Sequence, residues 1–294
     1  MEKKEVMAGI RSCLQSFSKY HRQAKTKGSE ASVHELRTNA RRLRNSLKTH
    51  SFLFQKKKIK KIDCSIKKLA AHASELRDLD VFISFLLNYK KKLKKKNQQV
   101  CLNQYISSMK EKRKKYASVL KSKLKNADVM NIIQRPVNKQ LRRAKEMDAK
   151  HLMPFFQKRI HETVEQLLQY DSIVHLTNKD KEIHEMRIKA KHLRYTLEEI
   201  GDNFDHRIKS YTAQSLFFHK ILGEIHDYDV WIAMIDEDPI NQQDNKDMKN
   251  MLKSLQDYCR RSRLNRYRIF VRRWDILRKN RFFENLLELV YAHG

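Results

Sequence analysis

Glycine and proline are scarce in this sequence: 294 residues contain only 5 Gly and 3 Pro. Because these residues most often interrupt helices and build turns, their scarcity favours long helices joined by short turns. The phosphate loop that ends in Gly-Lys-Ser/Thr is absent, as are the His-Glu-x-x-His and Gly-x-Ser-x-Gly motifs. No stretch alternates between polar and apolar residues as a half-buried strand would. The sequence therefore predicts an all-α protein without a familiar catalytic motif.

Cysteines and long apolar runs are also few. Cys13, Cys64, Cys101 and Cys259 form no Cys-x-x-Cys pair, and each lies in an apolar periodic stretch. This predicts small buried thiols rather than a disulfide framework or a zinc site. No apolar run approaches the ~20 residues of a membrane-spanning helix, and the first residues lack the apolar run of a signal peptide. We therefore expect a cytoplasmic protein with no membrane span.

Acidic residues are outnumbered: 34 Asp and Glu face 64 Lys and Arg, which gives a formal net charge of +30. The repulsion among so many positive charges destabilises the folded chain unless a polyanion or an anionic surface is the usual partner. Nucleic acid, polyphosphate and acidic membranes all satisfy this requirement on charge alone.

One basic helical pattern occurs twice, 150 positions apart. At about 100° per residue, residues 33–48 place one apolar stripe beside one cationic stripe, and residues 183–197 repeat the arrangement. The apolar stripes contain Val33, Leu36, Ala40, Leu43 and Leu47 in the first copy, and Met186, Ala190, Leu193 and Leu197 in the second. The cationic stripes contain His34, Arg37, Arg41, Arg44 and Lys48, and His184, Arg187, Lys191 and Arg194.

A charged stripe is most often the solvated face of an amphipathic helix, and for one copy that interpretation would stand. These stripes, however, nearly exclude acids, whereas a solvated face usually mixes signs to form i,i+4 pairs. Each row spans about 15 Å from its His to its last Arg at 1.5 Å per residue. The repetition and this length favour a linear chain of phosphates over a small ligand.

The repeated pattern His-x-x-Arg-x-x-x-(Arg/Lys)-x-Leu-Arg resembles the CHAD domain, the conserved histidine α-helical domain. A second signature of that family, Arg-Asp-x-Asp-Val, is matched by Arg77-Asp78-Leu79-Asp80-Val81, and its counterpart reads His226-Asp227-Tyr228-Asp229-Val230. The resemblance covers nearly the whole chain. It implies two four-helix bundles that bind inorganic polyphosphate without chemistry of their own, and it suggests that both motif helices face one shared cleft.

The apolar register of residues 6–20 recurs in residues 156–170, which indicates an internal duplication. We therefore predict an all-α fold of two tandem four-helix bundles related by pseudo-two-fold symmetry. The predicted division is a first unit at 1–127, a helical linker at 128–150 and a second unit at 151–294. Gly28-Ser29 should end the first helix and cap the second. Pro136 and Pro154 should mark breaks around a short linker helix.

The predicted polyphosphate-binding residues combine both rows with arginines of the two fourth helices, and no catalytic residue, metal or cofactor is expected. They are His34, Arg37, Arg41, Arg44, Lys48, His184, Arg187, Lys191, Arg194, Arg113, Arg263 and Arg266. The histidines are interpreted as hydrogen-bond donors to phosphate, because no His-x-x-x-His follows either one. Association with polyphosphate granules is a further expectation.

Four carboxylates, Asp78, Asp80, Asp227 and Asp229, allow two interpretations: they brace nearby arginines or cap helices, or they hold Mg²⁺ for phosphoryl chemistry. Against the second, the His of a metal-binding His-Asp dyad at 226 is replaced by Arg77 in the first copy.

A basic nucleic-acid-binding protein is the main alternative function. The cationic faces, however, lack stacking aromatics apart from Tyr195, and no helix-turn-helix signature occurs. A metal-dependent phosphohydrolase is the weaker alternative.

Overall fold

The computed structural model describes residues 3–126, 128–143, 152–177, 179–201, 205–242 and 245–292. Within these ranges the chain is helical and contains no strand, so the all-α prediction is confirmed. No helix of this described part carries a stretch long and apolar enough to cross a membrane. The chain divides into two compact units, Glu2–Met147 and Asp148–Gly294.

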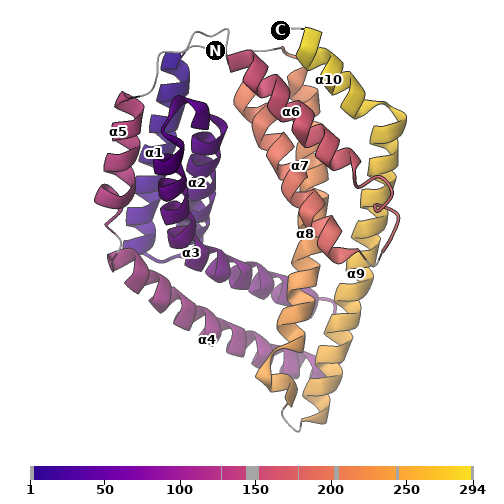
Figure 1. Ribbon diagram of the computed structural model, residues 1–294. Helices are drawn as coiled ribbons and strands as arrows, with labels where there is room; N and C mark the ends of the chain where they lie inside the picture. Colours follow the sequence, from indigo (N-terminus) through magenta and orange to yellow (C-terminus); the bar gives the residue numbers. More distant parts are fainter. Residues whose placement is uncertain are drawn as a thin grey trace. The chain divides into compact units, whose positions relative to one another are not determined.

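The first unit is built on four long helices, which are drawn from indigo to magenta in Figure 1. They are α1 (Lys3–Thr26), α2 (Glu30–Thr49), α3 (Lys56–Lys90) and α4 (Lys96–Asn126). Consecutive helices pack together, and α4 also contacts α1. A short 3-10 turn (Ser51–Leu53) joins α2 to α3. Large side chains such as Phe17, Leu36, Phe82 and Tyr105 are fully buried between the helices.

The predicted turn between α1 and α2 forms as expected. Gly28 follows the end of α1 with φ of +59°, a conformation that glycine adopts without a Cβ clash. Ser29 then caps α2, because its side-chain oxygen accepts a hydrogen bond from the amide of Ser32 at 3.3 Å. This turn fixes where the first cationic row begins.

The segment predicted as a linker contributes structure to the first unit. A π-helical turn (Met130–Gln134) leads into α5 (Arg135–Arg142), and both contact α3. Val137 and Leu141 of α5 are buried, which explains why the helix packs against the first unit. As predicted, Pro136 and Pro154 mark breaks around a short helix: they lie in the first turns of α5 and α6, where a missing N–H costs no hydrogen bond. Residues 144–151 of the predicted linker lie outside the described residues.

The second unit contains α6 (Leu152–Leu168), α7 (Asp180–Ile200), α8 (Ile208–Asp236), α9 (Lys246–Lys279) and α10 (Phe282–Ala292). A short 3-10 turn (Pro239–Gln242) precedes α9, whose N-cap is Asn245. Consecutive helices from α6 to α9 pack together, and α10 contacts both α6 and α9 (Figure 1). The helix α10 was not predicted from the sequence, and it begins directly after Arg281, whose φ is +50°. Its buried Phe283, Leu286 and Val290 join the core around Trp274.

The cysteine prediction was partly wrong. None of the four cysteines, all of which lie among the described residues, forms a disulfide, and Cys101 and Cys259 are buried as expected. Cys13 is half-buried, whereas Cys64 is exposed on α3. Helical periodicity places a residue near an apolar stripe, but the neighbouring helices decide how far the core extends around it.

Candidate functional site

The first cationic row lies on α2 beside a fully buried stripe. Val33, Leu36, Ala40, Leu43 and Leu47 each have no exposed surface. His34 and Lys48 at the two ends of the row are exposed, while the three arginines between them, Arg37, Arg41 and Arg44, are half-buried. Arg37 is oriented by α3, because its Nε donates to Ser74 Oγ at 3.2 Å. The row is therefore a set of partly desolvated cations at the edge of a core rather than a freely solvated face.

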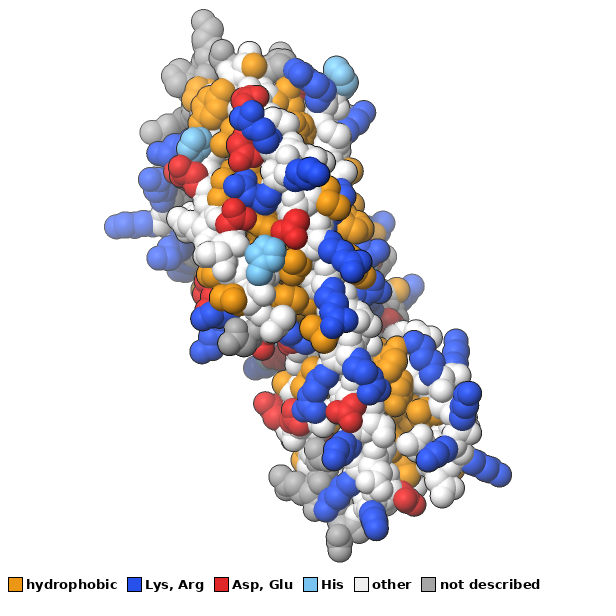
Figure 2. All heavy atoms as spheres, turned by 90° about the vertical axis from the view of Figure 1, so that its right-hand side faces the viewer, with side chains coloured by type: hydrophobic (Ala, Val, Ile, Leu, Met, Phe, Trp, Pro, Cys, Tyr) orange, Lys and Arg blue, Asp and Glu red, His pale blue; other side chains and the backbone are white. Residues whose placement is uncertain are grey.

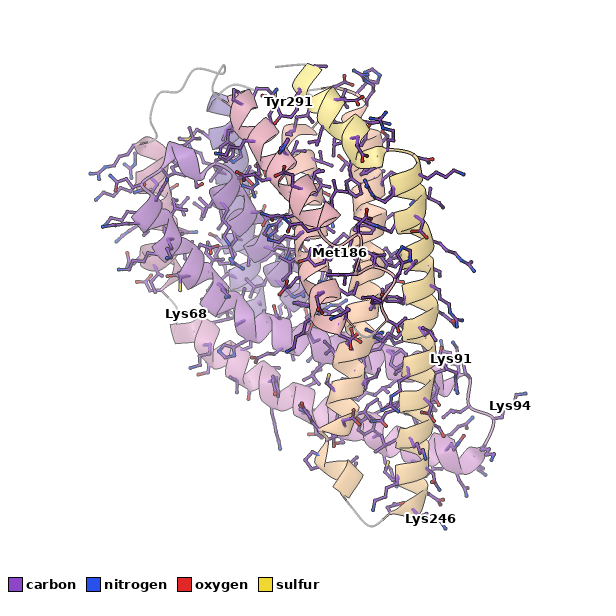
Figure 3. All side chains as sticks on the ribbon, turned by 45° about the vertical axis from the view of Figure 1, so that its right-hand side comes forward. Lys68, Lys91, Lys94, Met186, Lys246 and Tyr291 are labelled. Atoms are coloured by element: carbon purple, nitrogen blue, oxygen red, sulfur yellow. The ribbon has the colours of Figure 1, made fainter. Side chains whose placement is uncertain are left out.

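The second row repeats this placement on α7. Met186, Ala190, Leu193 and Leu197 are buried, and Met186 is labelled in Figure 3. The row itself, made of His184, Arg187, Lys191 and Arg194, is half-buried throughout. The two units thus present His, Arg and Lys in matching order, and the central cations Arg37, Arg41 and Arg44 are half-buried like their counterparts Arg187, Lys191 and Arg194.

The far ends of the rows differ in charge. In the first unit Arg44 Nε donates to Asp63 at 2.7 Å, and Lys48 Nζ lies 3.4 Å from the same carboxylate. In the second unit the position 150 residues after Lys48 is Glu198, which accepts a hydrogen bond from Arg194 Nε at 2.8 Å. The second row therefore has one cation fewer than the first, and a carboxylate stands at its end.

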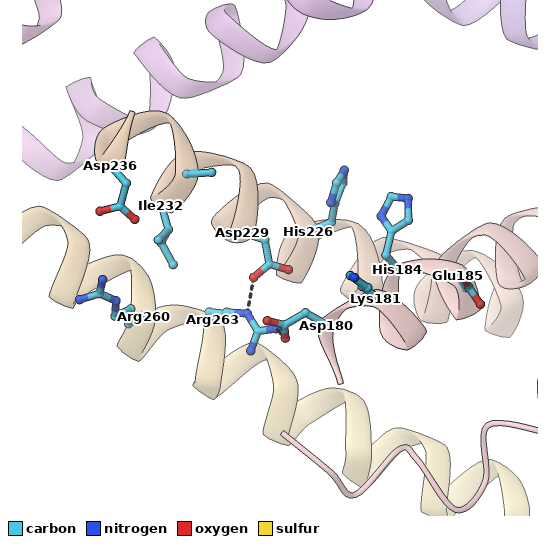
Figure 4. A pocket seen from close by; sticks show the side chains of 11 residues that line it. Asp180, Lys181, His184, Glu185, His226, Asp229, Ile232, Asp236, Arg260 and Arg263 are labelled. Carbon is cyan, nitrogen blue, oxygen red and sulfur yellow. Dashed lines mark hydrogen bonds and ion pairs between the residues drawn. The ribbon is translucent and has the colours of Figure 1, made fainter. Parts of the chain in front are cut away.

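An open hollow lies at the start of each row. In the first unit it has a volume of about 420 Å³ and is lined by Glu30, Ala31, His34, Glu35 and Arg77. In the second unit it has a volume of about 740 Å³, and five of its residues occupy the matching places, namely Asp180, Lys181, His184, Glu185 and His226. Figure 4 shows His184 of α7 and His226 of α8 beside each other in this hollow. Neither Arg77 nor His226 was among the predicted binding residues, although both stand in the second family signature.

The first histidine of each row has a lowered pKa. For His34 the causes are burial and then the nearby Arg77 guanidinium, and for His184 they are burial and then Arg187. Both rings are therefore neutral at pH 7, and a neutral imidazole still donates one hydrogen bond. A bound anion would favour the protonated ring and raise its pKa.

Two of the four signature carboxylates brace arginines of the fourth long helices. Arg113 on α4 donates to Asp80 on α3, and Arg263 on α9 donates to Asp229 on α8. Burial raises the pKa of both carboxyl groups, and the guanidinium groups partly offset that rise. Among the described residues, no group of three or more His, Cys, Asp or Glu side chains could hold a metal ion. The bracing interpretation is confirmed for Asp80 and Asp229.

The predicted arginines of the fourth long helices are therefore already engaged within the protein. Arg263 also bonds to Asp180 at the start of α7, and Arg266 Nε lies 3.0 Å from Glu224. Of the three, Arg113 and Arg263 are half-buried and Arg266 is exposed. These contacts place Arg263 at the border of the hollow in the second unit, where it holds the local carboxylates.

Other cations are distributed widely. Figure 2 shows Lys and Arg side chains over the face that it presents, with acidic and hydrophobic side chains between them. On α9 the exposed cations include Arg261, Arg268 and Arg272. The lysine-rich turn between α3 and α4 is exposed at Lys91 and Lys94, which are labelled in Figure 3. Surface charge alone therefore does not distinguish the two rows, whereas their half-burial and repetition do.

Comparison with known proteins identifies the family. The sequence matches the CHAD domain over residues 8–236. The crystal structure of the CHAD domain from the plant Ricinus communis is similar with a TM-score of 0.72 at 15% identity, covering 92% of this chain and 90% of that one. The structure of PptA from Streptomyces chartreusis gives a TM-score of 0.67 at 15% identity, covering 92% of this chain and 98% of that one. No curated protein matches. At such identities the structures show a shared fold, and with the family match over most of its length this chain belongs to the CHAD domain family.

Proposed function

We propose that this protein binds inorganic polyphosphate through the cationic rows of α2 and α7 and catalyses no reaction on it. The observation that carries the proposal is the recurrence of one row of His, Arg and Lys on two helices of the same chain, with three half-buried cations in each row. Arginine forms bidentate hydrogen bonds with phosphate oxygens, and lysine adds point charge. A row of about 15 Å along a rigid helix suits consecutive phosphate groups of one linear anion.

Partial burial makes these rows better suited to an anion than exposed cations would be. Half-buried guanidinium groups have already lost part of their hydration, and the surrounding contacts, such as that of Arg37 with Ser74, reduce the entropy lost on binding.

The shared cleft implied by the family resemblance stays a prediction. We further propose a cytoplasmic location with association to polyphosphate granules, consistent with the net charge of +30.

Calorimetric titration with long-chain polyphosphate and with a length-matched DNA duplex, both at physiological salt, tests the ligand class. We expect tight binding of polyphosphate alone, with an affinity that falls steeply as salt rises because counterions are released. Equal binding of both polyanions would instead support the alternative of a basic nucleic-acid-binding protein, which the cations exposed on α9 favour.

The site is tested by Arg37→Glu combined with Arg187→Glu, which should abolish polyphosphate binding while circular dichroism still reports full helicity. The matched control is Arg261→Glu with Arg268→Glu on the exposed face of α9, which changes the net charge equally. Retained affinity in the folded row variant contradicts the site, and an equal loss in the control shows that net charge alone is measured.

A metal-dependent phosphohydrolase is the remaining alternative, and it makes a different prediction. It requires Mg²⁺-dependent release of phosphate that is lost in Asp78→Ala or Asp227→Ala. Under our proposal no such release occurs in the unchanged protein, whatever the divalent cation.

A further inference from the structure

The two units differ at one position of the hollow. In the first unit Arg77 of α3 donates to Glu30 at the start of α2, at 2.7 Å. In the second unit His226 of α8 stands in the place of Arg77, three residues before the bracing Asp229. The acid at the start of α7, Asp180, bonds instead to Arg263 of α9. A permanent cation in one hollow is thus replaced by a titratable group in the other.

His226 lies directly beside the first residue of the α7 row. The ring centroids of His184 and His226 are 4.8 Å apart, and the ring planes are inclined by 59°. Both rings line the open hollow of about 740 Å³ (Figure 4). A ligand that enters this hollow therefore meets two imidazoles at once, on two different helices.

The carboxylates around the pair already have donors. From α7, Asp180 bonds to Arg263, and Glu185 accepts from the Tyr170 hydroxyl at 3.2 Å. From α8, Asp229 also bonds to Arg263, and Asp236 accepts from Gln256. A positive charge added to the imidazole pair would therefore compete with existing donors for these carboxylates.

The nearby cations act in the opposite direction on the pair. Lys181, Arg187 and Lys191 of α7 face this region, and Arg260 and Arg263 of α9 line the hollow. Burial lowers the pKa of His184 most, and Arg187 and Lys191 lower it further, while Glu185 and Asp229 raise it less. A phosphate group would stabilise a protonated imidazole of the pair, because it brings a negative charge and oxygens that accept the N–H hydrogen bonds.

We infer that His184 and His226 form a phosphate-binding subsite at the start of the α7 row, which takes up a proton as the anion binds. This inference rests on the proposed function and adds His226 to the binding residues. Because two close imidazoles interact, the pair takes up protons in steps and acts as one unit. The first unit has an arginine at the corresponding position, Arg77, and arginine side chains stay charged in proteins, so proton uptake there is left to His34 alone.

The experiment compares polyphosphate affinity at pH 6 and pH 8, at constant salt, in the unchanged protein and in His226→Arg. The unchanged protein should bind roughly fivefold more tightly at pH 6, within the tenfold change per pH unit that one linked proton permits. In His226→Arg the ratio should be smaller than in the unchanged protein, because one imidazole of the pair no longer titrates, and the affinity at pH 8 should be close to that of the unchanged protein at pH 6. Titration in two buffers of different ionisation enthalpy measures the proton uptake directly.

Two further variants control for other causes. His206→Arg makes the same substitution at a histidine whose side chain is 90% exposed in the same unit, and it should leave the pH ratio unchanged. His226→Gln should lose affinity at pH 6 and also lack proton uptake, which keeps the test open if His226→Arg does not fold. The titration of polyphosphate itself, and of His34, is common to all variants.

The outcomes separate the two proposals. Tight binding with the same pH ratio and proton uptake in the unchanged protein and in both His226 variants overturns the subsite and leaves the proposed function intact. Absence of polyphosphate binding at every pH overturns the proposed function and the subsite with it.

Discussion

Arg113 on α4 donates a hydrogen bond from Nε to Asp80 on α3, and the side chain of Asp80 is only 2% exposed. The pair joins two long helices of the first unit across 33 positions of sequence. A buried carboxylate is costly unless a donor compensates it, which is why burial raises the pKa of Asp80 while Arg113 opposes the rise. The Asp229–Arg263 contact repeats this relationship in the second unit.

Removing one partner of this pair should be more harmful than removing both. We expect Arg113→Met to lower the free energy of unfolding by roughly 3 kcal/mol, because it leaves the Asp80 charge buried without its donor. The double variant Asp80→Leu with Arg113→Met should recover much of the loss. Urea denaturation at pH 7 measures both, and a double variant less stable than Arg113→Met would contradict the bracing role.

The end of the α7 row offers a gain-of-affinity test that depends on the proposed function. Glu198 neutralises Arg194 where the first unit has Lys48. Glu198→Lys should strengthen polyphosphate binding roughly fivefold, the upper end of what one exposed ion pair contributes. Glu162→Lys on α6 makes the same charge change away from the row. Equal gains in the two variants would show that position in the row does not matter.

His21 should make the stability of the first unit depend on pH. Its ring is 8% exposed, and burial followed by the charge of Lys25 lowers its pKa to about 4 from an ordinary 6.5. His21 therefore binds a proton below pH 6.5 in the unfolded chain, but only below about pH 4 in the folded chain. The free energy of unfolding falls as the pH drops through this window. Between pH 7 and pH 5 the loss is about 2 kcal/mol.

The variant His21→Leu removes the titratable imidazole and places an apolar side chain of similar size in the core. Urea denaturation at pH 7 and pH 5 should show a smaller loss of stability in His21→Leu than in the unchanged protein. The difference between the two losses is the predicted quantity, and parallel losses would show that His21 is protonated equally in both states.

Two glycines of the second unit should respond oppositely to alanine. Gly201 follows α7 with φ of 58° and ψ of −163°, a region that essentially only glycine occupies. Gly201→Ala should therefore cost about 1–3 kcal/mol. Gly223 lies inside α8, where a Cβ would meet no atom within 4 Å, so Gly223→Ala should stabilise the helix by about 0.5–1 kcal/mol. Thermal unfolding distinguishes the signs, and a stabilising Gly201→Ala would contradict the conformational argument.

The sequence by itself determined the features that depend on helical period and local chemistry. Scarce breakers and apolar spacing predicted the long helices, Gly28-Ser29 predicted a turn and a cap, and the two cationic rows follow from residues three or four positions apart. All of these are interactions within one or two turns of a single helix, so knowledge of the neighbouring helices was not needed.

The tertiary structure alone decided which side chains meet across helices. The pairing of Asp80 with Arg113, the approach of His226 to His184 and the exposure of Cys64 depend on how helices pack side by side. So does α10, whose apolar face is buried against α6 and α9. Periodicity tells which face of a helix is apolar, but the packing of one helix on another sets its rotation and axial position. The charge of each row was therefore readable from the sequence, whereas the partners that hold and tune it required the fold.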